Sequence, residues 1–90
     1  MKIEIEYVAQ VRSASGVSSE MLELPEGSTV MDALAGVATK HPGKLASMLF
    51  GDDGSASKSI LLFRGDDQVE SATPVNAGDR LTILSPLAGG

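Results

Sequence analysis

The carboxyl-terminal segment carries the residues whose types could do chemistry. It consists of Pro86, Leu87, Ala88, Gly89 and Gly90. Proline cannot extend a strand ladder and fixes φ near −65°, so it stiffens the exit from the last strand. Five extended residues reach at most about 17 Å. Because glycine has no Cβ, Gly89 and Gly90 can enter a channel too narrow for other residues and deliver the Gly90 carboxylate into a partner's active site.

A terminal carboxylate is anionic at neutral pH and is therefore a poor electrophile. It reacts only after activation, most simply as an acyl-adenylate made by an ATP-using partner. A sulfur nucleophile would then yield a thiocarboxylate, and a lysine amine would yield an isopeptide bond. The plain alternative is a frayed tail, because small residues at chain ends are commonly disordered.

The composition narrows the possible partners. The 90 residues contain 12 acidic and 7 basic side chains, which gives a formal net charge of −5. Such a surface repels nucleic acid and anionic membranes and suits a basic protein partner. Without cysteine the chain has no disulfide, thiolate metal site or catalytic thiol. No signal peptide or apolar span is present, which predicts a cytoplasmic protein.

No constellation of catalytic side chains is recognisable elsewhere in the chain. His41 is the only histidine and precedes Pro42, so it is interpreted as an exposed residue at the end of a helix rather than a metal ligand. The pairs Asp52-Asp53 and Asp66-Asp67 both adjoin glycine, which is typical of turns. We therefore predict a protein that is not an enzyme and that binds no metal.

Periodicity predicts the elements that position the tail. Apolar residues alternate at Ile3, Ile5 and Tyr7, so a strand is expected there, with a possible extension from Val8 to Val11. Thr29 and Asp32 are spaced as a helix cap before an apolar stripe that ends near Lys40. The remaining expectations are a loop at 12–19, strands at 20–24, 59–63, 68–70 and 80–85, and a short helical turn at 44–50.

This order predicts an α+β domain of the β-grasp type, with a mixed sheet of four to five strands packed on one helix. The domain is expected to span residues 1–85, and residues 86–90 are expected to form a flexible diglycine tail. Because Gly90 ends the sequence, no protease is expected to be needed to expose the diglycine.

Residues 77–90 resemble the end of the MoaD/ThiS family of ubiquitin-like sulfur carriers, which share a Gly-Asp turn, an apolar strand, a proline and a final Gly-Gly. Residues 27–34 resemble the start of the family's helix, and residues 73–75 its approach to the Gly-Asp turn. Residues 60–65 resemble its central strand, with Arg64 in place of the usual asparagine. Residues 85–88 resemble the molybdopterin synthase small-subunit branch, although Ser85 replaces a common first proline.

The resemblance implies that Gly90 is adenylated by a ubiquitin-activating-type adenylyltransferase, which uses ATP, while this chain binds no cofactor. Sulfur would come from a donor such as a cysteine desulfurase or a rhodanese-type protein. The thiocarboxylate would then serve an acceptor such as the molybdopterin synthase large subunit, whose small, non-catalytic subunit this chain would be. Carriers for thiamine, cysteine or another metabolite remain alternatives, as does a modifier conjugated to lysines.

Partner docking is expected beside the tail. Leu84 is out of phase with Leu81 and Ile83, so it should face away from the core. Leu61 and Phe63 are candidates for the same surface, and the alternative that they belong to the core stays open. Arg64 and Arg80 could pair with acidic groups of a partner or simply be solvated.

Overall fold

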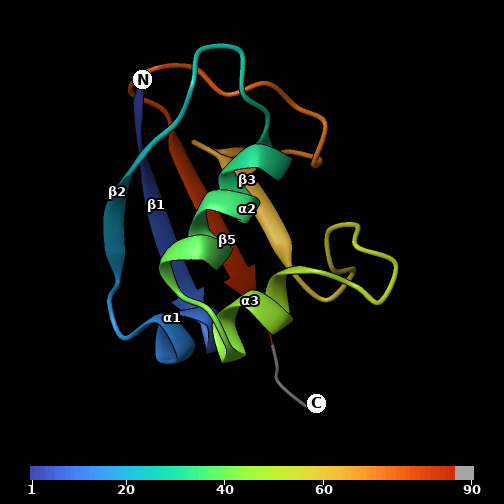
Figure 1. The fold of residues 1–90 in the computed structure, drawn as a ribbon. Coiled ribbons are helices and arrows are strands. Elements are labelled where there is room, and N and C mark those ends of the chain that lie inside the picture. The colour runs from blue at the N-terminus through green and yellow to red at the C-terminus, as the bar shows by residue number, and fades with distance from the viewer. Residues whose placement is uncertain (87–90) are drawn as a thin grey trace.

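A computed structural model describes residues 1–86 of the chain. Within this part the elements follow one another in an α+β order (Figure 1). The strands are β1 (Lys2–Ala9), β2 (Ser19–Glu23), β3 (Leu61–Arg64), β4 (Asp67–Gln68) and β5 (Arg80–Ser85). The helices are α1 (Gln10–Ser15), α2 (Val30–Lys40) and α3 (Lys44–Leu49). None of the helices in residues 1–86 is both long and apolar enough to cross a bilayer.

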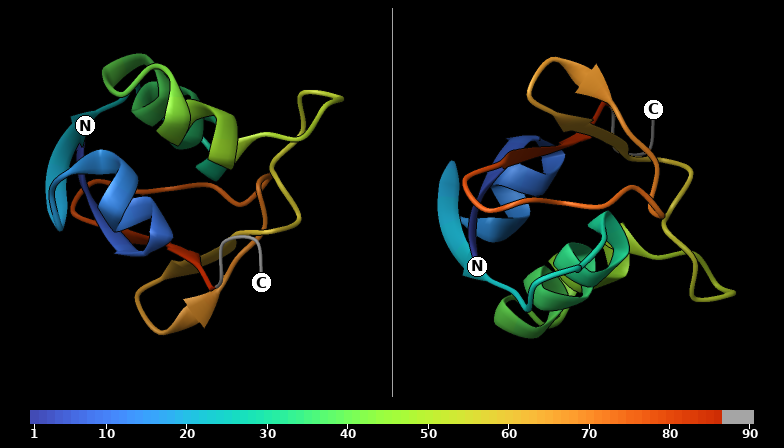
Figure 2. Two further views of the ribbon diagram at one scale, coloured as in Figure 1. Left: turned by 90° about the horizontal axis from the view of Figure 1, so that it is seen from below. Right: turned by 90° about the horizontal axis from the view of Figure 1, so that it is seen from above.

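The five strands form one mixed sheet in the order β2-β1-β5-β3-β4. β1 and β5 pair in parallel, and the other neighbouring pairs are antiparallel. The helices α2 and α3 lie on one side of this sheet, as the views from below and above show (Figure 2). The expected mixed β-grasp sheet is confirmed.

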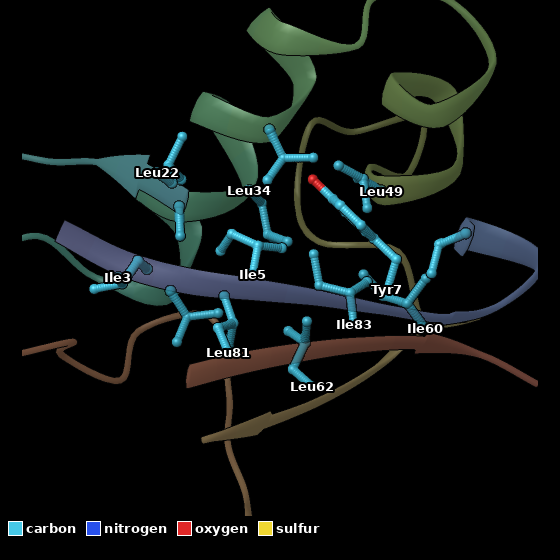
Figure 3. Packing of buried hydrophobic residues seen from close by; sticks show 14 of the residues in the cluster. Ile3, Ile5, Tyr7, Leu22, Leu34, Leu49, Ile60, Leu62, Leu81 and Ile83 are labelled. Carbon is cyan, nitrogen blue, oxygen red and sulfur yellow. The ribbon is translucent and has the colours of Figure 1, made fainter. Parts of the chain in front are cut away.

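The core lies between the sheet and the helices. Ile3, Ile5 and Tyr7 alternate along β1 and point toward the helices, and Leu34 of α2 packs onto them (Figure 3). β5 contributes the buried side chains at positions 81 and 83. The period of two that predicted β1 is thus the period of burial, because alternate side chains of a strand leave opposite faces.

Helix α2 begins where its cap residues predict. The Thr29 hydroxyl accepts a hydrogen bond from the Asp32 N–H at 3.4 Å, and the Asp32 carboxylate accepts from the Thr29 N–H at 2.9 Å. This reciprocal pair satisfies two of the free amides of the first turn. Gly36 lies where α2 crosses β2, and an added Cβ would stand 3.2 Å from two methyl carbons of Leu22. The glycine therefore permits close packing at the crossing.

Helix α1 is the element that the sequence interpretation missed. The expected extension of the first strand is confirmed as far as Ala9 and wrong for Gln10 and Val11, and the loop expected from Arg12 is wrong as far as Ser15, because the chain turns into a helix at Gln10. Val11 is fully buried and Ala14 packs partly against the same core, one turn later. Gly16 ends the helix at φ 80°, a left-handed conformation that favours glycine. The helix is short and rich in serine, so the spacing of Val11 and Ala14 does not stand out as a helical pattern in the sequence.

The expectation of a single helix on the sheet is likewise incomplete. α3 is the short helical turn predicted at 44–50, and its Leu45 and Leu49 complete the core. The strands β2, β3 and β4 each begin and end within one or two residues of their predicted limits. The first and last residues of a strand depend on which strands pair with it, and the residue pattern of one strand does not show its partners.

Candidate functional site

The base of the tail is held by the centre of the sheet. β5 lies between β1 and β3, so both edges of the last strand are hydrogen-bonded. Its final residue, Ser85, is buried and lies opposite Ala9. Pro86 follows and is exposed. The predicted tail residues Leu87, Ala88, Gly89 and Gly90 lie outside the described residues, so their roles stay predictions.

Apolar side chains gather where β5 ends. We call the side of the sheet that faces away from α2 and α3 the open face. On it Leu84 lies directly opposite Leu61 of β3 on one side and Val8 of β1 on the other. All three are partly buried, and each alternates with residues that belong to the core. One step further from the tail, Phe63 faces Thr82 on the same surface.

Leu84, Leu61 and Phe63 thus share one face, and the core packs on the other. A partly exposed apolar surface next to charged residues is typical of a protein interface. Their docking role remains a prediction, and so does that of the arginines.

The two arginines occupy different faces. Arg80 lies on the open face, where its Nε donates to a Glu4 carboxylate oxygen at 3.1 Å. This hydrogen bond, together with the charges of Glu4 and Glu6, raises the pKa of Arg80. Arg64 pairs in register with the buried Leu81, so its side chain leaves the opposite face. There its guanidinium donates to the Pro74 carbonyl at 2.8 Å and fastens the segment before β5 to the sheet.

A hydrogen-bonded cluster around Glu20 was not foreseen from the sequence. One carboxylate oxygen of Glu20 contacts both the Tyr7 hydroxyl and the His41 Nε2, and the other lies 3.4 Å from the Lys40 ammonium. His41 lies at the end of α2 as predicted, but the expectation that it is exposed is wrong, because its side chain is 23% exposed and its ring meets that of Tyr7 edge-on. The partners are 13 to 21 residues apart, and no local pattern marks such pairs.

The cluster shifts two ionisation equilibria. Partial burial acts to raise the pKa of Glu20, but hydrogen bonds from Tyr7 and His41 and the charges of His41 and Lys40 outweigh it and hold the pKa below its usual value. Burial and the neighbouring carboxylate raise the pKa of Tyr7. The hydrogen bonds of Glu20 tie β1, β2 and the end of α2 together, which is a structural role.

The acidic turn residues are bound locally. The Asp53 carboxylate accepts hydrogen bonds from the Ser55 N–H at 3.0 Å and from the Ser55 hydroxyl, and these lower the pKa of Asp53. In residues 1–86 no three His, Asp or Glu side chains gather as metal ligands. A pocket lies beside β4 and is lined by Gln68, Val69, Glu70 and Thr73. Its lining holds a single carboxylate, that of Glu70, and no side chain paired with it for acid–base chemistry.

Comparison with known proteins places this geometry in a family. The sequence matches the ThiS family over residues 5–90. The chain belongs to the ThiS family of ubiquitin-like sulfur carriers. It is 30% identical over 88 residues to small archaeal modifier protein 1 of Haloferax volcanii, covering 98% of this chain and 100% of that one. The crystal structure of that relative superposes with a TM-score of 0.91, at 29% identity and full coverage of both chains.

Other solved structures with this fold belong to proteins with different names. A putative molybdopterin converting factor subunit 1 from Pyrococcus furiosus is 25% identical and covers 97% of this chain and 99% of its own, with a TM-score of 0.79. The BexX/CysO complex of Amycolatopsis orientalis contains a chain that is 25% identical, covers 98% of this one and 99% of its own, and superposes with a TM-score of 0.75. The family is thus established, and the similar proteins include a modifier, a subunit of a converting factor and a chain from a complex of two proteins.

Proposed function

We propose that this chain is a sulfur carrier whose Gly90 carboxyl group is adenylated by a ubiquitin-activating-type enzyme and converted to a thiocarboxylate. The observation that carries the proposal is the position of the tail base. The tail leaves from the central strand β5, beside the apolar row of Val8, Leu84 and Leu61. A partner that binds this row receives the tail in a fixed direction, which lowers the orientational cost of the reaction.

The chemistry proceeds in two balanced steps. An oxygen of the Gly90 carboxylate attacks the α-phosphorus of ATP, the bond to the β-phosphate oxygen breaks, and pyrophosphate leaves. A persulfide of the donor protein, a cysteine desulfurase or a rhodanese-type protein, then attacks the acyl carbon, and AMP leaves. A thiol reduces the resulting acyl disulfide, so that a thiocarboxylate remains on Gly90 and a disulfide forms on the thiol side.

In this reaction the chain presents its carboxyl terminus to the partner enzymes and supplies no catalytic side chain. It has no cysteine, so sulfur cannot be held as a side-chain persulfide and has to be carried on the terminal carbonyl. ATP is bound by the activating enzyme, and the carrier itself needs no cofactor. We propose that it acts in the cytoplasm, where ATP and reducing thiols are available.

The acceptor we propose first is molybdopterin synthase, in which the chain would be the small subunit beside the large, catalytic one. The likeness to the Pyrococcus furiosus chain and the proline after β5 support this choice. Carriers for thiamine, cysteine or another sulfur-containing metabolite use the same activated end. Copurification with the large subunit of the synthase would support the first choice, and copurification with an enzyme of thiamine or cysteine formation would contradict it.

Conjugation to protein lysines is a second candidate function. It is favoured by the likeness to small archaeal modifier protein 1 over almost the whole chain. Attack of a lysine amine on the same acyl-adenylate releases AMP and leaves an amide bond, so activation is shared. Lysine-linked adducts in cells that disappear on deletion of Gly90 would establish this function beside the first.

Activation is tested by ATP–pyrophosphate exchange with the activating enzyme encoded in the same genome. The full chain should support exchange, and the chain lacking Gly90 should support none while keeping the same melting temperature. A variant with Gly89→Val should be adenylated poorly, because its side chain cannot enter a channel made for glycine. Equal exchange by the shortened chain would contradict the proposal.

A further inference from the structure

The charges of this acidic domain are divided between its two ends. β1 and β5 are parallel and finish together, with Ala9 opposite Ser85. We call this the tail-proximal end. α1 follows β1 directly and packs against β5 and α3, so both short helices lie beside the base of the tail (Figure 1). α2 runs toward the same end and stops at Lys40, whose ammonium reaches the start of β2.

Cations prevail at the tail-proximal end. Arg12 lies on α1, Lys40 ends α2 and Lys44 begins α3. The carboxylate of Glu20 lies among them and is already paired with Lys40 and His41, and the loop that follows α3 adds Asp52, Asp53 and Lys58. Arg12 and Lys44 are exposed, and neither takes part in an ion pair within residues 1–86.

Acidic residues prevail at the opposite end. β5 begins and β2 and β3 finish there, because β2 and β3 run antiparallel to their neighbours. α2 also begins at this end, where Val30 is hydrogen-bonded to Thr73. The carboxylates of these strand ends, turns and caps are those of Glu23, Glu26, Asp32, Asp66, Asp67 and Asp79. Lys2, Arg64 and Arg80 offset only part of this charge, and Arg80 is paired with Glu4.

We propose that Arg12 and Lys44 form a cationic collar around the base of the tail, which docks on a rim of acidic side chains at the mouth of the activating enzyme's channel. The inference rests on the proposed function and adds the chemistry of the partner surface. A domain that is negative overall but positive where its tail leaves is oriented tail-first by a partner of negative potential. Correct orientation raises the fraction of productive encounters.

The nucleotide itself is too distant to be the anion that the collar meets. A tail of five extended residues places the Gly90 carboxylate up to about 17 Å beyond the strand. At physiological ionic strength the Debye length is about 8 Å, so charges at the two ends of the tail are largely screened from each other. The anions near the collar are therefore carboxylates at the channel mouth, and the phosphates lie at the far end of the channel.

The test compares two variants of equal net charge. Arg12→Glu with Lys44→Glu alters the collar, and Lys2→Glu with Ala72→Glu and Ala77→Glu adds the same negative charge at exposed positions of the opposite end. Association with the activating enzyme, saturated with ATP, is followed by stopped-flow fluorescence at low and high salt. At low salt we expect the collar variant to associate roughly tenfold more slowly and the control variant to keep or exceed the rate of the unaltered chain. At high salt all three should converge.

Three results would overturn the proposal. Equal slowing by both variants would show an effect of net charge alone. Faster association of the collar variant would show a basic channel mouth. A reduced kcat at saturating carrier, with unchanged association, would mean that the collar acts on the reaction and not on docking. The milder pair Arg12→Gln with Lys44→Gln, against Lys2→Gln with Ala77→Glu, repeats the comparison at equal net charge if a reversal lowers the melting temperature.

Failure of the proposed function is recognised separately. If the unaltered chain binds the enzyme but supports no pyrophosphate exchange, then activation of Gly90 is wrong, while the rates of the two variants still decide the collar. If the unaltered chain does not bind the enzyme at any salt concentration, both proposals are overturned.

Discussion

Leu84 and Leu61 lie directly opposite each other on the open face, one strand position before the buried end of β5. The pair joins the strand that carries the tail to its antiparallel neighbour, and Val8 extends the row on the other side. A partner that covers this row removes three adjoining aliphatic side chains from water at the point where the tail begins. Hydrophobic docking and tail delivery are thereby coupled.

Leu84→Asp is expected to weaken binding to the activating enzyme by at least tenfold, because it buries a charge at the centre of the proposed contact. The measurement is the KM for the carrier in pyrophosphate exchange. Met21→Asp is the matched control, since Met21 is 52% exposed and lies on β2, across β1 from the row. A similar loss for both variants would argue against a local docking site at Leu84.

Glu20→Gln is expected to destabilise the fold at neutral pH by about 1–3 kcal/mol, because the amide cannot accept from Tyr7, His41 and Lys40 together. The folded-state pKa of Glu20 is lowered, so this stabilisation is present above the unfolded-state value of about 4.3 and is lost as the pH falls through the folded-state value. Urea unfolding of both proteins at pH 7 and pH 3 measures it. A difference that is as large at pH 3 as at pH 7 would contradict this assignment.

Ala9→Gly is expected to stabilise the protein by about 1 kcal/mol. Ala9 joins β1 to α1 at φ 63° and ψ −127°, a conformation that costs a residue with a Cβ roughly 1–3 kcal/mol. Glycine removes that strain and loses part of the gain to its freer unfolded chain. The midpoint of guanidinium unfolding should rise, and a fall would mean that the backbone is not strained at this junction.

Substitution of Gly36 should depend steeply on size. Gly36→Ala gains about 1 kcal/mol of helix propensity but brings a Cβ to 3.2 Å from the Leu22 methyls, so we expect a change close to zero. Gly36→Val adds bulk that Leu22 cannot avoid and should destabilise by about 1–3 kcal/mol. Thermal unfolding of the two variants measures the contrast, and equal melting temperatures would show that α2 shifts freely on β2.

The sequence predicts those features that rest on short-range patterns. Alternation predicted β1 and the outward direction of Leu84, and the spacing of Thr29 and Asp32 predicted the cap of α2. Helix α1 was not predicted, because its only fully buried residue is Val11 and its start depends on the positive φ of Ala9. A local pattern of at most two apolar residues is too weak to distinguish such a helix from a loop.

Contacts between residues far apart in the sequence could not be predicted from local residue patterns. The contacts of Glu20 with Tyr7 and His41, and the bond from Arg64 to the Pro74 carbonyl, depend on which elements the sheet brings together. The net charge of −5 likewise predicted a basic partner, while the fold separates the cations of α1 and α3 from the carboxylates of the opposite end. Composition gives the sum of the charges, and only topology shows their division.

The central claim is that Gly90 carries sulfur as a thiocarboxylate, and intact-mass spectrometry tests it most directly. The chain is incubated with its activating enzyme, ATP, a cysteine desulfurase and cysteine, with a thiol as reductant, and its carboxyl-terminal peptide is then sequenced by fragmentation. We predict that one oxygen is replaced by one sulfur and that the change resides on Gly90, with none when ATP is omitted. An unchanged mass with an enzyme that does adenylate the chain would contradict the claim.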